Sequence, residues 1–99
     1  MFQANDKQQG KRVIISILGP DRVGIIASVA TLLADNSVNI LDISQTTLQE
    51  YFSMILIADM GESNVSLDIL KNELAAKGKE LGVRIDAQHE DVFNFMHRI

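Results

Sequence analysis

The pattern of hydrophobic and polar positions first indicates two strands at the centre of a sheet. Arg12 to Leu18 and Phe52 to Ala58 are rich in Ile, Leu, Val and Met on both of the faces that a strand presents. A strand with this pattern is covered on both sides, which is typical of the interior of a sheet. We therefore expect these two segments to be neighbouring central strands.

Two further segments have the pattern of strands, and each has its own irregularity. Val38 to Leu48 carries apolar residues whose phase changes between Ile40 and Leu41, so we expect a β-bulge or a change of covered face there. Val83 to Glu90 alternates apolar residues with charged or polar ones, which is typical of a half-exposed edge strand.

A helical repeat occupies the segments between these strands. The spacing i, i+4, i+7, i+8 from Ile25 predicts an amphipathic helix that ends at Asp35 to Ser37. Val65 to Leu81 places leucines on one helical face, and we expect Gly78 to interrupt this helix near its last turn. A short third helix, capped by Asp91, is predicted by the spacing of Val92, Phe95, Met96 and Ile99.

This order of elements predicts an α+β fold of the ferredoxin-like βαββαβ type. We expect a four-stranded antiparallel sheet with two helices on one face and a short C-terminal helical tail. Residues 1–11 have no apolar periodicity and read as a flexible leader, and residues 12–99 read as a single domain. The second face of the sheet keeps apolar surface, so we expect it to be covered by the tail, with Phe93, Phe95 and Met96, by a second subunit, or by both.

Composition removes several classes of function. The chain has 99 residues, a net charge of -4 and no evident basic cluster, which argues against duplex nucleic acid or an anionic membrane as the main partner. It has no cysteine, so disulfides, thiolate metal sites and cysteine nucleophiles are excluded. Without a long apolar run or a signal-peptide pattern, we expect a cytoplasmic protein.

The candidate site is the turn from Gly19 to Gly24, between the first strand and the first helix. Its glycines and proline are turn residues, and the turn leads into helical N–H groups that suit a carboxylate or another small anion. The alternative is a tight connection that binds nothing. Helix-terminus interactions contribute about 0.3 to 1 kcal/mol each, whereas micromolar affinity needs roughly -8 kcal/mol. Binding therefore requires a second segment or a second subunit.

Three stretches of the sequence together resemble the ACT domain family. They are Gly19-Pro20-Asp21-Arg22-Val23-Gly24-Ile25, Asn39-Ile40-Leu41-Asp42-Ile43-Ser44-Gln45-Thr46 and Tyr51-Phe52-Ser53-Met54. More narrowly, the chain is similar to small stand-alone bacterial ACT proteins, to the regulatory N-terminal domain of formyltetrahydrofolate deformylase and to glycine-cleavage repressor-like proteins. The resemblance covers Val13 to roughly Ile85. It implies a regulatory module that binds an amino acid or similar metabolite, usually between two such domains.

The resemblance also implies which residues bind the ligand. It points to Asp21, Gly24 and Ile25 in the first loop, and to Asn39 and Asp42 from the partner copy. Each polar residue has an ordinary alternative: Asp21 as a helix cap, Asn39 as the start of a strand and Asp42 as the acceptor for a nearby backbone N–H. Arg22 is either a solvated side chain or an anion clamp.

We therefore expect a homodimer or higher homo-oligomer that senses an amino acid and signals to a separate partner protein. The alternative is a protein-protein interaction or dimerisation module with no small ligand. No catalytic arrangement can be argued from the residues, so no enzyme activity is expected. No cofactor or metal is expected either, because the spacing of His89, Glu90, Asp91 and His97 matches no familiar ligand set.

Overall fold

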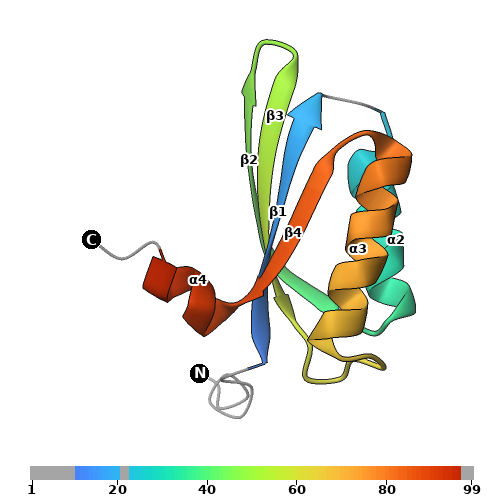
Figure 1. The fold of residues 1–99 in the computed structure, drawn as a ribbon, viewed down its shortest axis with the longest axis vertical. Helices are drawn as coiled ribbons and strands as arrows, with labels where there is room; N and C mark the ends of the chain where they lie inside the picture. Colours follow the sequence, from blue (N-terminus) through green and yellow to red (C-terminus); the bar gives the residue numbers. More distant parts are fainter. Residues whose placement is uncertain (1–10, 21–22, 97–99) are drawn as a thin grey trace.

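A four-stranded antiparallel sheet forms the middle of the computed structural model, which describes residues 11–20 and 23–96. The strand order is β2-β3-β1-β4 (Figure 1). The strands are β1 (Arg12–Pro20), β2 (Asn39–Leu48), β3 (Tyr51–Asp59) and β4 (Arg84–His89). The two segments with apolar residues on both faces are the central strands β1 and β3, as predicted, and β4 lies at an edge.

Two helices cover one face of this sheet, and a third lies on the other side. Figure 1 shows α2 (Ile25–Asp35) and α3 (Leu67–Leu81) together on one side, with the short α4 (Glu90–Met96) opposite. The predicted ferredoxin-like βαββαβ fold with a C-terminal helical tail is therefore confirmed. The predicted leader lies outside the described residues except for Lys11, whose carbonyl accepts a hydrogen bond of 2.9 Å from the Met60 N–H.

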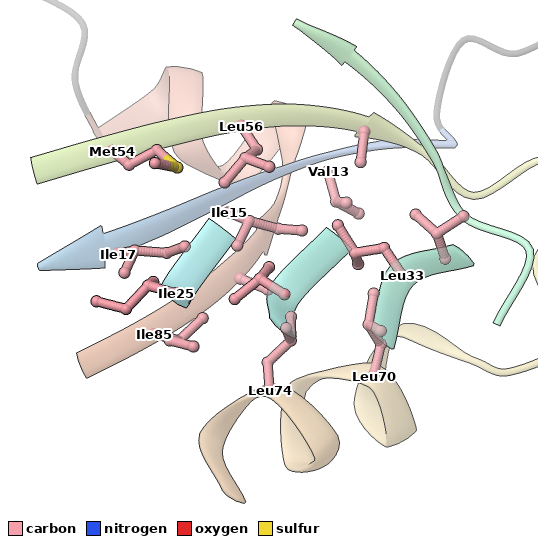
Figure 2. Packing of buried hydrophobic residues seen from close by; sticks show 14 of the residues in the cluster. Val13, Ile15, Ile17, Ile25, Leu33, Met54, Leu56, Leu70, Leu74 and Ile85 are labelled. Carbon is pink, nitrogen blue, oxygen red and sulfur yellow. The ribbon is translucent and has the colours of Figure 1, made fainter. Parts of the chain in front are cut away.

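The core lies between the sheet and the pair α2 and α3. Figure 2 shows alternate side chains of β1 and β3 meeting apolar side chains from both helices. Burying a Leu or Ile side chain completely contributes about 1.5 to 3 kcal/mol, so this layer fixes the positions of the helices on the sheet. The largest side chains that are fully buried include Ile15, Ile17, Leu33, Leu56, Leu70 and Leu74.

The predicted irregularity in β2 is present as a shift in its pairing with β3. Ile40 pairs with Ala58 and Asp42 with Ile57, so Leu41 is the extra residue. Beyond the shift, Ile43 pairs with the buried Leu56 and therefore points to the side of the helices. The bulge brings Ile43 to that side, but Ile43 stays as exposed as Leu41.

Two predictions about the C-terminal half were wrong. Helix α3 continues through Gly78, because this glycine is needed for a close approach: a Cβ there would lie 2.7 Å from the carbonyl oxygen of Val83. Helix α4 begins at Glu90, so Asp91 lies within its first turn and is not the cap. Instead, the Asp91 N–H donates to Nδ1 of His89, which precedes the helix, at 3.1 Å.

Candidate functional site

The turn after β1 leads into α2 through a glycine in the left-handed conformation. Gly24 has φ 88° and ψ 0° and occupies the N-cap position of α2. A Cβ at Gly24 would have open space around it, so the backbone angle, and not crowding, favours glycine there. Gly19 differs, because its Cβ would lie 2.9 Å from Cγ1 of Val83.

The first turn of α2 has no polar side chain among the described residues to satisfy its N–H groups. Gly24 has no side chain to act as a cap, and the first turn contains no acidic residue. The N–H groups of Ile25, Ile26 and Ala27 precede the first helical hydrogen bond, which runs from Ser28 N–H to the Gly24 carbonyl at 2.9 Å. These donors, with the positive end of the helix dipole, suit a small anion.

The other loop residues contribute in different ways. Ile25 has a side chain that is 2% exposed and packed in the core, so only its backbone N–H can reach a ligand. A helix cap directly precedes the first helical residue, and Gly24 holds that position. Whether the Asp21 side chain also caps this helix stays a prediction. Both Asp21 and Arg22 lie outside the described residues.

Within one copy, Asn39 and Asp42 are not near this turn. Asn39 pairs with Asp59 at one end of β3, whereas Pro20 pairs with Tyr51 at the other end. A nine-residue strand is roughly 27 Å long, so almost the whole sheet separates Asn39 from the turn. Asp42 already has a local role, because its Oδ1 accepts a hydrogen bond of 2.9 Å from the Ile43 N–H.

Strand β2 is an edge of the sheet, as the predicted central positions of β1 and β3 require, but its apolar character as an edge was not predicted. Its ten residues include Asp42 as their single charge, and the side chains of Leu41 and Ile43 are 43% and 44% exposed. Ile26 on α2 is also exposed, at 38%. A long edge strand with few charges and exposed apolar side chains is a surface for pairing with another strand. The single charge in this strand and its apolar residues Leu41 and Ile43 were the sequence signals that could have shown this surface.

No helix in the described part of the chain is long and apolar enough to cross a membrane. Among the same residues, no three His, Asp or Glu side chains gather as a metal site, and His97 lies outside them.

Comparison with known proteins agrees with this fold. A model of the ACT domain matches residues 11–88. A UPF0237 protein of Clostridium acetobutylicum is 53% identical over 88 residues, which are 89% of this chain and 99% of the relative.

Solved structures extend the comparison. An ACT domain protein from Streptococcus pneumoniae has a TM-score of 0.73 and 38% identity, over 83% of this chain and 92% of that one. A formyltetrahydrofolate deformylase from Pseudomonas syringae pv. tomato has a TM-score of 0.73 and 25% identity, over 86% of this chain but 30% of that enzyme. From the matched family model and the close relatives, this chain belongs to the ACT domain family.

Proposed function

We propose that this protein is a regulatory domain that binds an amino acid or related small metabolite between two copies and signals to a separate protein. Membership of the ACT family supports the regulatory role. The observation that carries the proposal is the start of α2. The N–H groups that follow Gly24 there have no polar cap among the described side chains. The carboxylate of an amino acid is the anion that this proposal assigns to them.

The edge of β2 supplies a geometry in which a second copy completes the site. If two β2 strands pair antiparallel, Asn39 of one copy lies beside Leu48 of the other. Leu48 pairs with Tyr51, and Tyr51 pairs with Pro20, so that end of the partner sheet leads into its Gly24 turn. The pairing therefore brings Asn39 to the same end of the sheet as the partner's turn, although one copy keeps them apart.

Each part then has a distinct role in binding. The first-turn N–H groups of α2 hold the carboxylate, and the side-chain oxygen of Asn39 from the second copy accepts a hydrogen bond from the ammonium group. Asp42 adds negative charge near that ammonium group. Asp21 and Arg22 belong to the same turn, and the proposal includes both among the residues that bind the ligand. The exposed Ile26 and Ile43 contribute the apolar surface that joins the two copies.

Thermal unfolding against a panel of the twenty amino acids tests this function. A ligand present at 100 times its dissociation constant stabilises by about 2.7 kcal/mol, which for a domain of this size raises Tm by about 10 °C or more. We expect one compound to raise Tm in this way and the variant Asn39→Ala to remove the shift. Asn72→Ala, at another exposed asparagine on α3, is the matched control and keeps it.

The same measurement separates the proposal from its alternative. If every amino acid at millimolar concentration leaves Tm unchanged, the protein is an interaction module without a small ligand. The variant Ile43→Lys places a charge on the β2 edge and is expected to abolish both the edge dimer and the ligand shift. Ile69→Lys, at a side chain of similar exposure on α3, is the control and keeps both.

A further inference from the structure

Strand β4 forms the edge of the sheet opposite to β2. Among the described strands it pairs only with β1, because the strand order is β2-β3-β1-β4. Alternate N–H and C=O groups of an edge strand point away from the sheet. Apart from the pairing with β1, no backbone–backbone hydrogen bond reaches residues 84–88 in the part of the chain that the structure describes. The outer backbone groups of these residues can therefore pair with an added strand.

A groove runs along this edge, between β4 and α3, which lies next to it (Figure 1). The groove has a volume of about 310 Å³, and its wall on the helix consists of Lys71, Asn72 and Ala75. Its other wall consists of four consecutive residues of β4, residues 85–88. Because successive side chains of a strand point to opposite faces, four consecutive residues indicate that the backbone edge itself lines the groove. We call this the α3 groove.

A second hollow lies on the other face of the same strand, opposite α2 and α3. It measures about 380 Å³, and Ile14, Ile55 and Phe93 give it an apolar lining beside Asp86 and Gln88. Successive side chains of a strand added to β4 would point alternately to the side of α3 and to this opposite face. An extended peptide at the β4 edge therefore finds a recess for each of its two sets of side chains.

The charges at this edge differ between the two faces. Lys71 is exposed in the α3 groove and forms no ion pair with a described side chain. Arg84 and Asp86 neutralise each other in an ion pair of 2.9 Å, and they lie on the opposite face because Ile85 between them is buried in the core. The ammonium group of Lys71 is thus the charge that a strand in the groove meets, and it favours an acidic side chain there.

We propose that β4 and α3 bind an extended peptide segment of a partner protein, which adds to the sheet as a further strand. The segment alternates acidic side chains, directed to Lys71, with large apolar ones, directed to the opposite face. Backbone hydrogen bonds to residues 84–88 supply affinity, and the two recesses supply selectivity. That this partner is the protein to which the domain signals rests on the proposed function, but the binding of the segment does not require the amino acid.

The composition of β4 argues against a second copy of this strand in the groove. The side chains that β4 directs away from the helices are all polar, namely Arg84, Asp86 and Gln88. A second β4 would therefore bring no apolar side chain to the hollow on that face. On its helix side it carries no acidic residue that could pair with Lys71, and Ile85 and Ala87 are buried in its own core.

Fluorescence anisotropy with a labelled peptide tests the proposal. The probe is a capped peptide of six residues, the length of β4, in which leucine alternates with glutamate. We expect it to bind the purified chain, and we expect Lys71→Glu to weaken binding by about tenfold or more because attraction becomes repulsion. Lys79→Glu makes the same change of charge at an exposed residue of α3 outside the groove, and is expected to keep the affinity.

Two neighbouring alanines on α3 test the groove itself. Ala75 and Ala76 are both exposed, but only Ala75 lines the groove. We expect Ala75→Met to fill the groove and weaken binding of the peptide, and Ala76→Met to keep it, while far-ultraviolet circular dichroism stays unchanged for both. If Lys71→Glu and Ala75→Met both left the affinity unchanged, the peptide would bind elsewhere and the proposal would be overturned.

Methylation of the peptide backbone separates strand addition from other kinds of binding. Alternate N–H groups of an added strand point toward β4, and the others point away from it. Of two probes that are methylated at alternate backbone nitrogens, we therefore expect one to bind and the other not to bind. We also expect the bound probe to slow hydrogen exchange at alternate amides of residues 84–88. Equal affinity of the two methylated probes overturns strand addition.

Other occupants of the groove and other binding sites give results that also overturn the proposal. Binding that Ile43→Lys abolishes and Lys71→Glu does not would place the peptide at the β2 edge. Slow exchange at β4 together with a doubled mass, in the chain without peptide, would show that a second copy occupies the groove. Absence of binding at millimolar peptide also counts against it. Lys71→Glu is expected to keep the shift in Tm caused by the amino acid, so failure of this proposal is distinguishable from failure of the proposed function.

Discussion

Helices α2 and α3 cover the same face of the sheet, but their first turns are built differently. Helix α3 begins after Ser66, whose Oγ accepts a hydrogen bond of 3.3 Å from the Ile69 N–H, and Asp68 adds negative charge to its first turn. Helix α2 begins after Gly24 in the left-handed conformation, with no side-chain cap among the described residues.

The two helices therefore differ in whether the N–H groups of the first turn have a side-chain acceptor. Ser66 and Asp68 satisfy the first turn of α3 locally, so a bound anion gains little there. The first turn of α2 keeps its donors for another group. This contrast is the reason that the proposed function places the ligand at α2.

The largest expected effect on the free energy of unfolding comes from a feature that both helices share, a buried apolar side chain near the first turn. Leu70 in α3 is fully buried, and Leu70→Ala is expected to lower the free energy of unfolding by about 2 to 5 kcal/mol because it leaves a cavity. Urea unfolding measures this change. Ile69→Ala, beside it but 48% exposed, is expected to cost less than a third as much. Equal losses for the two variants would contradict the described core.

The next effect is at the backbone of Gly24. Gly24→Ala is expected to lower the free energy of unfolding by about 1 to 2 kcal/mol, because a residue with a Cβ is strained at this positive φ. Gly24→Asn is the matched comparison and is expected to cost less, since asparagine tolerates the left-handed region. If alanine and asparagine were equally tolerated, the left-handed start of α2 would be in doubt.

A smaller effect is expected at the start of α3. Ser66→Ala removes the acceptor for the Ile69 N–H and is expected to lower the free energy of unfolding by about 1 kcal/mol. Ser66→Asp keeps an acceptor and is expected to restore most of the loss. Neither variant is expected to change the ligand-dependent shift in Tm. If either variant removed the shift, the ligand would bind at the first turn of α3 and not at that of α2.

The smallest change in stability tests whether α2 can be made to resemble α3. Ala27 is exposed in the first turn of α2, and Ala27→Glu is expected to raise the free energy of unfolding by about 0.3 to 1 kcal/mol through the helix dipole. The same carboxylate is expected to compete with an anionic ligand and remove the shift in Tm. Ala27→Gln is similar in size but uncharged, and is expected to keep the shift. If both variants bound equally well, no carboxylate would lie at this turn.

Local sequence determined the elements and the nature of the turn. Apolar residues on both faces of two segments identified β1 and β3 as the central strands, because the period of burial along a strand is a local property. The phase change near Leu41 likewise located the bulge. Two glycines and a proline marked the turn before α2. These features depend on neighbouring residues, and a sequence pattern records them directly.

Tertiary structure decided which residues, distant in the chain, those elements contact. The pairing of strands shows that Asn39 lies far from the turn of its own copy, and the exposure of Leu41 and Ile43 shows that the β2 edge is apolar. From its helix propensity, Gly78 is expected to interrupt the helix, but the close approach of the Val83 backbone explains why glycine is needed there. The position of α3 beside β4 likewise decides that a groove lies along that edge of the sheet. Such contacts join residues that are distant in the chain, and periodicity reports how deeply a side chain is buried but not which partner buries it.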